Sequence, residues 1–189
     1  MKASGAQRYP LVLRVLHWLL APLLAAQILL GFAAERWTPR ATSDLLFPFH
    51  FQLGILILCL MLLRLALRLA LPVPGHEEGE SPWRHRLRAA VHGLLYALVL
   101  LLPISGHVIW VWMGADRTFF GALEIPAFFV PPDEETGRAL AWYVHVYGAW
   151  TLLALVCLHG AAAMSHAWRR KDGFIARRMG FGGMRKTAD

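Results

Sequence analysis

Charged residues are scarce in this sequence: they make up 16% of its 189 residues, whereas 57% are hydrophobic. So few charges cannot cover the surface of an ordinary water-soluble domain of this length, and a membrane is the expected solvent. The basic residues, 19 against 12 acidic ones, flank apolar stretches and form no module of their own. We therefore expect no binding of nucleic acid.

Cysteine is also scarce. Cys59 and Cys157 are the only two, and both lie within apolar stretches, so we expect no structural disulfide. The sequence has no Cys-x-x-Cys-His pattern, which excludes covalent attachment of a c-type haem. Acidic residues are missing from the apolar stretches, which argues against a proton or metal transporter.

Hydrophobic residues fall into four long blocks. They predict transmembrane helices at about residues 11–34, 44–71, 84–113 and 139–169, each long enough to cross about 30 Å of hydrocarbon. The expected fold is an all-α, four-helix transmembrane bundle in a single domain, residues 1–189, with a basic tail at 170–189. The first block follows basic residues, as in a signal peptide, but it is about twice the usual length, so we expect a retained helix.

Basic residues also predict the orientation. Fifteen of the 19 fall on the side of the two termini and the connection between the second and third helices. The other side has only Arg36, Arg40, Arg117 and Arg138. By the positive-inside rule both termini are expected in the cytoplasm, with the basic side chains near anionic lipid headgroups.

Five histidines lie in or at the ends of the apolar blocks, where an ionisable side chain is costly and indicates function: His17, His50, His92, His145 and His159. The last two are fourteen residues apart on the fourth predicted helix. That spacing returns them to within about 40° of one face and separates them by about 21 Å along the axis. One helix can therefore serve two stacked sites.

Depth in the bilayer predicts the partners of these two histidines. His50 and His145 are both expected near the outer leaflet, and His17 and His159 near the inner leaflet. Two imidazoles at each of two depths suit two low-spin haem b groups. Zinc would be left short of ligands, because each pair offers only two. The alternative for a single histidine is a hydrogen bond between helices.

Glycines accompany these histidines. They could leave room for a flat macrocycle or for close helix packing, although glycine is common in membrane helices without a cofactor. The residues concerned are Gly31, Gly54, Gly106, Gly148 and Gly160.

At this point the sequence resembles the bacterial cytochrome b561 family and, more distantly, the cytochrome b subunits of hydrogenases and formate dehydrogenases. The match spans nearly the whole chain. The residues that carry it are Arg14-Val-Leu-His17-Trp18, His50 with Gly54, Arg64-Leu-Ala-Leu-Arg68 before a Pro-x-Pro turn, His92 before Pro103, and His145 with His159-Gly-Ala-Ala-Ala-Met-Ser-His166.

The resemblance implies a multi-pass protein of the bacterial inner membrane. It implies that His17 and His159 ligate an inner haem and His50 and His145 an outer one. It also implies a quinone near the inner haem, and its members include a superoxide oxidase that passes electrons to ubiquinone. The expected activity is therefore that of a superoxide:ubiquinone oxidoreductase.

Several further residues gain possible roles from this resemblance. The quinone candidates are His166, His92 and Arg88, and the candidates for attracting superoxide are Arg36, Arg40 and Arg117. Alternatives stay open for each group. His166 could be a surface residue, and His92 could be a packing residue or compete with His17 as a ligand. Arg14 and Arg88 could pair with haem propionates or anchor helix ends.

Two other functions remain open. One is a cytochrome b subunit that passes electrons from a periplasmic dehydrogenase or hydrogenase to quinone. The other is a haem-free transporter or structural membrane protein. The outer loops carry no self-sufficient chemical motif, so the sequence does not choose the electron donor.

Overall fold

Four long helices make up most of the protein. The computed structural model describes residues 8–36, 40–75, 81–170 and 178–180. Its helices are α1 (Leu11–Arg36), α2 (Arg40–Ala70), α3 (Pro82–Trp112) and α4 (Thr136–Arg170). All four are long and apolar enough to cross a membrane. The predicted four-helix transmembrane bundle is confirmed.

Three helices begin earlier than the apolar blocks indicated. α2 begins at Arg40, α3 at Pro82 and α4 at Thr136, because hydropathy does not detect a polar first turn outside the hydrocarbon. At α3, Ser81 is the extended N-cap residue. Pro82 then occupies the first helical position, where its missing N–H is not needed. Of the predicted tail, residues 171–177 and 181–189 lie outside the described residues.

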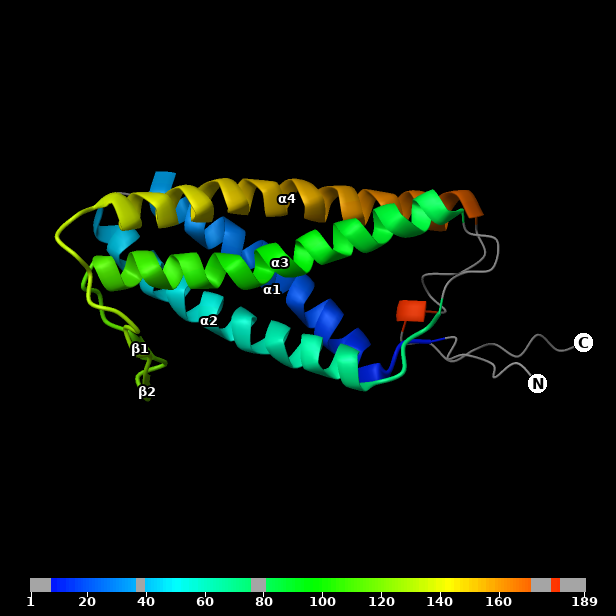
Figure 1. Ribbon diagram of the computed structural model, residues 1–189, viewed down its shortest axis with the longest axis horizontal. Coiled ribbons are helices and arrows are strands. Elements are labelled where there is room, and N and C mark those ends of the chain that lie inside the picture. The colour runs from blue at the N-terminus through cyan, green and yellow to red at the C-terminus, as the bar shows by residue number, and fades with distance from the viewer. Residues whose placement is uncertain (1–7, 37–39, 76–80, 171–177, 181–189) are drawn as a thin grey trace, which may run out of the picture.

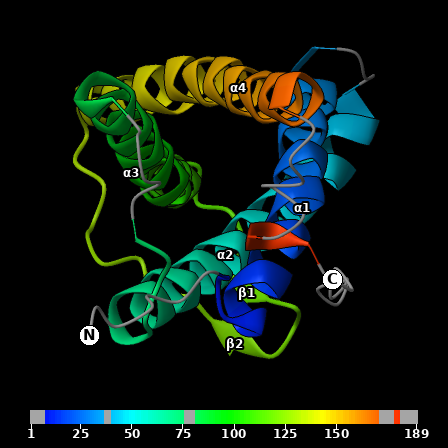
Figure 2. The same cartoon turned by 90° about the vertical axis from the view of Figure 1, so that its right-hand side faces the viewer.

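The four helices run along the long axis of the molecule, and helices consecutive in sequence pack together (Figure 1). Both ends of the described chain lie at one end of the bundle, which we call the terminal end. The opposite end, which we call the hairpin end, carries two short strands, β1 (Thr118–Phe119) and β2 (Leu123–Glu124). Seen along the bundle, the helices form a four-sided arrangement (Figure 2).

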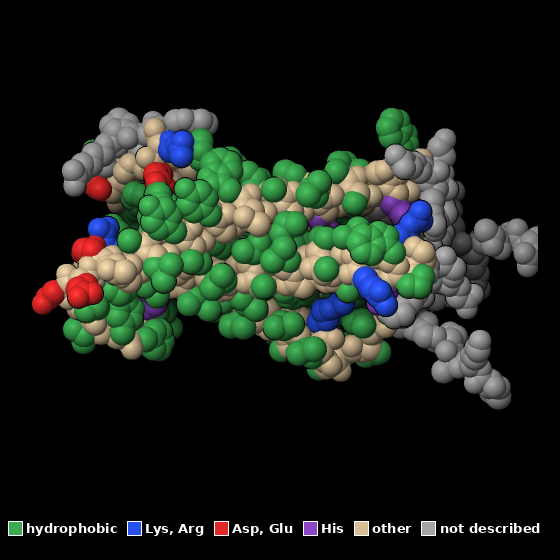
Figure 3. Space-filling view, turned by 45° about the horizontal axis from the view of Figure 1, so that its top comes forward, with side chains coloured by type: hydrophobic (Ala, Val, Ile, Leu, Met, Phe, Trp, Pro, Cys, Tyr) green, Lys and Arg blue, Asp and Glu red, His purple; other side chains and the backbone are tan. Residues whose placement is uncertain are grey.

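Large apolar side chains cover the outside of the bundle. Leu29 and Leu158, for example, are about two-thirds exposed, as expected for residues that face lipid chains. Figure 3 shows hydrophobic side chains along the middle of the helices and acidic side chains gathered at the hairpin end. A buried apolar cluster takes residues from all four helices: Leu20, Ile57, Met61, Leu98, Val99, Leu102 and Leu152.

The hairpin between α3 and α4 is antiparallel, with Thr118 opposite Glu124 and Phe119 opposite Leu123. Its turn requires positive φ at two successive residues, Phe120 (47°) and Gly121 (70°). Glycine adopts this conformation without steric cost, whereas phenylalanine does so with strain.

Candidate functional site

Two pairs of histidines face each other within the bundle, one toward each end. The ring centroids of His50 and His145 are 5.9 Å apart, with an angle of 79° between the ring planes. Those of His17 and His159 are 6.3 Å apart, at 86°. Helix α4 contributes one histidine to each pair, and α2 and α1 contribute the others. The fold thus brings together the two pairs that depth predicted.

Both rings of the hairpin-end pair have their Nδ1 atoms held by backbone carbonyls. Nδ1 of His50 lies 3.1 Å from the carbonyl oxygen of Gln27. Nδ1 of His145 lies 2.9 Å from that of Leu102 and 3.1 Å from Oγ of Ser105. A carbonyl only accepts, so Nδ1 carries the proton and Nε2 keeps its lone pair. That is the tautomer in which Nε2 can bind a metal.

Two glycines allow these rings to lie against neighbouring helices. A Cβ on Gly31 would lie 2.7 Å from Cε1 of His50, and one on Gly106 would lie 2.9 Å from Cε1 of His145. Contacts that short are sterically forbidden, so a side chain at either position would displace the ring.

The other three glycines have different surroundings. A Cβ on Gly54 would meet the side chain of Gln27, and one on Gly148 would meet that of Leu102. Nothing lies within 4 Å of a Cβ on Gly160. Gly54 and Gly148 thus make room for side chains of neighbouring helices, whereas Gly160 borders open space. None of the three glycines faces an imidazole.

A third histidine joins the terminal-end pair. The ring centroid of His92 lies 5.1 Å from that of His159, and its Nδ1 lies 2.7 Å from the carbonyl oxygen of Arg88 one turn earlier. Nη2 of Arg88 in turn lies 3.4 Å from Nδ1 of His85. Among the described residues, no hydrogen bond reaches the rings of His17 or His159, unlike those of the hairpin-end pair.

Residues Arg178–Gly180 lie against the start of α1, and we call them the C-terminal strap. The indole N–H of Trp18 donates to the carbonyl of Met179 at 3.0 Å, and the guanidinium of the buried Arg14 donates to that of Gly180. The Trp18 ring also packs edge-on against that of His17, at 5.4 Å between centroids. The strap therefore helps to hold the residues beside the terminal-end pair.

His166 lies seven residues beyond His159 on α4, about 10 Å nearer the terminal end, and is half-buried. A shallow groove is lined by its helix neighbours Ala161, Met164, Ser165 and Trp168. His166 is not among the residues that line this groove; seven residues of helix return it to within about 20° of the face that carries His159.

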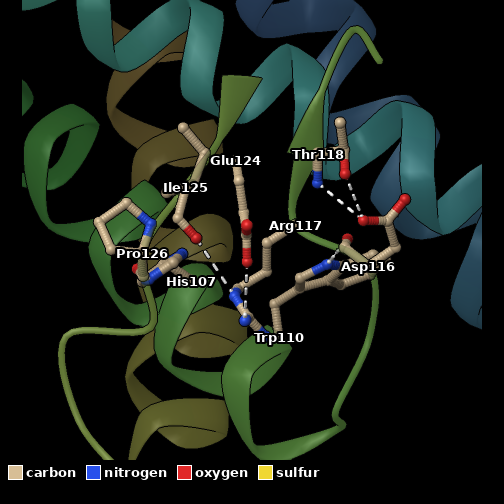
Figure 4. A network of polar contacts seen from close by, with 8 residues as sticks. All are labelled: His107, Trp110, Asp116, Arg117, Thr118, Glu124, Ile125 and Pro126. Atoms are coloured by element: carbon tan, nitrogen blue, oxygen red, sulfur yellow. Dashed lines mark hydrogen bonds and ion pairs between the residues drawn. The ribbon is translucent and has the colours of Figure 1, made fainter. Parts of the chain in front are cut away.

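The arginines proposed to attract superoxide have separate surroundings. Arg36 lies over the Phe32 ring, at 5.7 Å from its centroid. Arg117 is engaged within the hairpin: its Nε donates to the carbonyl of Ile125 at 3.2 Å, and it pairs with Glu124 at 3.7 Å (Figure 4). The Arg40 side chain lies outside the described residues.

Sequence reasoning passed over two polar residues inside the helices. His107 is 9% exposed, and its Nε2 lies 3.1 Å from the carbonyl oxygen of Pro126 (Figure 4). Its ring stacks on that of Phe51. Together with the bond from Trp110 Nε1 to the Asp116 carbonyl, it fastens the hairpin to α3. Gln27 contacts His50. The sequence could have indicated both His107 and Gln27, because each is a polar residue within an apolar block.

Membrane-crossing helices that bring imidazoles together near both ends have the architecture of a membrane b-type cytochrome. The family model of the prokaryotic cytochrome b561 matches residues 8–182. The chain therefore belongs to this family, as the sequence predicted. It is a multi-pass bacterial membrane protein of electron transfer, and the family implies that it binds haem b.

Curated relatives agree with this assignment. The chain is 27% identical over 180 residues to cytochrome b561 homolog 2 of Escherichia coli, with 92% of each chain covered. It is 28% identical over 166 residues to cytochrome b561 homolog 1 of the same organism, covering 87% of this chain and 92% of the relative. A protein of Yersinia pestis named probable superoxide oxidase CybB is 30% identical over 173 residues, covering 87% and 91%.

The two histidine pairs fit haem b. Metal–imidazole bonds of about 2 Å on opposite sides of one iron place the two ring centroids about 6 Å apart. The observed separations are 5.9 and 6.3 Å. Among the described residues no group of three or more His, Cys, Asp and Glu could hold a bare metal ion. The donor set thus suits a metal whose remaining ligands come from a macrocycle.

Proposed function

We propose that the protein holds two haem b groups, one between His50 and His145 and one between His17 and His159, and that it acts as a superoxide:ubiquinone oxidoreductase. The separation of the ring centroids in both pairs supports two haems. The Yersinia relative named as a probable superoxide oxidase supports the activity. Each haem, held by its two histidines, would supply one-electron oxidation and reduction at its iron.

The reaction balances as follows. Two superoxide ions each lose one electron and become oxygen, and one ubiquinone takes up two electrons and two protons to become ubiquinol. With the basic terminal end in the cytoplasm, superoxide reacts at the periplasmic hairpin end and the quinone takes its protons from the cytoplasmic side. The protein's task is to hold the two sites and to keep the substrates apart.

The ring distances favour His17 over His92 as the partner of His159. The His17 ring is 6.3 Å from that of His159, close to the spacing of two axial ligands, whereas the His92 ring is 5.1 Å away. The Nδ1–H of His92 is held by the Arg88 carbonyl. We therefore assign His92 to the surroundings of the site, where its Nε2 can accept a hydrogen bond.

His166 is the first candidate for binding the quinone. Its imidazole can donate a hydrogen bond to a quinone carbonyl and relay a proton to it. The apolar groove formed by Ala161, Met164 and Trp168 suits an isoprenoid tail. Arg88, which contacts His85, has a more peripheral place in this proposal.

Arg36 is the first candidate for attracting superoxide. Among the described residues, no ion pair joins its guanidinium to a carboxylate, whereas Arg117 is paired with Glu124. Asp44 and Asp116 line a cavity of about 280 Å³ at the hairpin end, so the attraction must be local to the end of α1.

The experiment uses the purified full-length protein. Its haem content is measured first, with two haem b per chain expected. Superoxide is then generated beside the protein in liposomes that contain ubiquinone. We expect rapid haem reduction and formation of ubiquinol, suppressed by superoxide dismutase. Haems that stay oxidised, or ubiquinone that stays unreduced, would refute the activity.

A second candidate is a cytochrome b subunit that receives electrons from a periplasmic protein. The exposed apolar residues of the hairpin end favour it: Phe128 is 79% exposed and Val130 is 89% exposed. Exposed apolar side chains at a membrane protein's aqueous end can mark a docking surface. A redox partner that copurifies and reduces the haems without superoxide would establish this alternative in place of the first.

A further inference from the structure

Gln27 is a polar residue in the apolar middle of α1, between Ala26 and Ile28. A carboxamide in this environment costs free energy unless it forms hydrogen bonds. Polar residues within membrane helices usually form hydrogen bonds to another helix or belong to a functional site. Gln27 contacts a single site residue, His50, in three ways.

Two of these contacts run in opposite directions between the helices. In the third, Nε2 of Gln27 lies 3.4 Å from Nε2 of the His50 ring, which accepts as the unprotonated nitrogen. Nε2 of Gln27 donates to the backbone carbonyl of His50 at 2.9 Å. Nδ1 of the His50 ring lies 3.1 Å from the backbone carbonyl of Gln27 and donates to it. The side chain thus fixes the backbone of His50 to α1, and the backbone of α1 fixes the ring. Each bond keeps the other within range.

Space for this arrangement comes from two glycines. Gly54, one turn after His50, would place a Cβ 3.0 Å from Nε2 of Gln27. Gly31, one turn after Gln27, would place a Cβ 2.7 Å from the His50 ring. Both helices therefore lack a side chain where the glutamine and the histidine meet.

The corresponding bond at the other histidine of the pair is built differently. Nδ1 of His145 is held by the carbonyl of Leu102 and by Ser105, without a glutamine. Among the described residues, the rings of His17 and His159 have no such hydrogen bond. The Gln27–His50 arrangement is therefore specific to one imidazole of the four.

We propose that Gln27 is a positioning residue for the hairpin-end haem: its side chain fixes the backbone of His50 against α1, which keeps the ring within reach of the Gln27 backbone carbonyl as the Nδ1–H tautomer, with Nε2 presented to iron. This inference rests on the proposed haem ligation. A hydrogen bond from Nδ1 to a carbonyl raises the basicity of the ligating nitrogen and fixes its ring. A more basic ligand stabilises the oxidised iron and lowers the midpoint potential.

The test replaces the glutamine by a residue of the same length without a donor, Gln27→Met. Gln52→Met is the matched control, since Gln52 Oε1 accepts from the Phe120 amide at the hairpin and does not contact a histidine. Single-haem variants His50→Ala and His17→Ala assign the two signals. Midpoint potentials are measured by redox titration, and ligand geometry by electron paramagnetic resonance.

We expect the potential of the hairpin-end haem to rise in Gln27→Met, its resonance to shift, and its retention to fall about tenfold, because the His50 backbone is no longer fixed where the Gln27 carbonyl reaches Nδ1. The terminal-end haem and the Gln52→Met protein should match the wild type. Selective loss of the hairpin-end haem would also support the proposal. Two unchanged haems, equal shifts in both, or loss of both would overturn it.

The wild-type protein separates this inference from the proposed function. If it contains only one haem, the paired-histidine proposal fails before any substitution is made. If it contains two haems but does not react with superoxide, the positioning role of Gln27 is still measured by the potentials.

Discussion

The Cα of Gly31 and the ring of His50 are so close that a Cβ on the glycine would lie 2.7 Å from Cε1 of the histidine. The helices α1 and α2 approach through this contact at the same level as the Gln27–His50 bonds. Helix packing and ligand orientation therefore depend on the same few atoms at the hairpin end.

Gly31→Ala should displace the His50 ring and weaken the hairpin-end haem. We expect haem content to fall from about two toward about one per chain, because a shifted imidazole no longer meets the axial geometry. Pyridine haemochrome analysis measures the ratio. Gly93→Ala is the control, since nothing lies within 4 Å of a Cβ there. Full haem content in Gly31→Ala would show that the ring can move without cost.

His17→Ala and His92→Ala should differ, although both residues lie beside His159. The first should lose the terminal-end haem, because it removes an axial ligand. The second should retain both haems and slow quinone reduction. Haem content and the reduced spectrum of each variant give the answer. Loss of the haem in His92→Ala but not in His17→Ala would show that His92, and not His17, is the ligand.

Acid should loosen the hairpin through Asp116. Hydrogen bonds from the side chain and backbone of Thr118 lower the pKa of the Asp116 carboxyl below its usual value. A lowered folded-state pKa contributes stability above the unfolded value of about 4, which is lost as pH falls through the folded-state pKa. The stability that Asp116 gives the hairpin should therefore be constant between about pH 5 and 8, and the protection factors of the hairpin amides should fall below about pH 4.

Hydrogen exchange of the hairpin amides measures this effect. Thr118→Val removes the hydroxyl donor and keeps the shape of the side chain. Protection at neutral pH should then be lower, and its further fall on acidification should be smaller, because the folded-state pKa of Asp116 lies nearer the unfolded value. An unchanged fall in Thr118→Val would show that this bond does not contribute to the hairpin's acid response.

Trp18→Phe should release the C-terminal strap while keeping an aromatic ring beside His17. It removes the indole donor to Met179, a bond of about 0.5–1.5 kcal/mol. Trypsin should then cut after Arg178 several-fold faster. Trp168→Phe is the control, because Trp168 is 82% exposed. Equal cleavage rates in the two variants would contradict the proposed fastening.

The sequence predicted the features that depend on one helix at a time. Four apolar blocks gave the crossings, and the fourteen-residue interval between His145 and His159 placed them on one face. The first turns of α2, α3 and α4 were missed because polar helical turns at a membrane surface carry no hydropathy signal.

Features that depend on two segments meeting were not predictable in this way. The contact of Gln27 with His50 requires the rotation of α1 about its own axis, which tertiary packing decides. The bonds of Arg14 and Trp18 with the strap join residues more than 160 positions apart. The nearness of Gly54 to the side chain of Gln27 likewise depends on how α1 and α2 pack.

Helix α4 contributes to both histidine pairs. The axial distance between His145 and His159 is therefore set by fourteen residues of one hydrogen-bonded rod, about 21 Å, and not by the packing of separate helices. A thinner or thicker bilayer can tilt this rod but cannot stretch it. The gap that an electron must cross should accordingly stay constant when the lipid composition of the membrane changes.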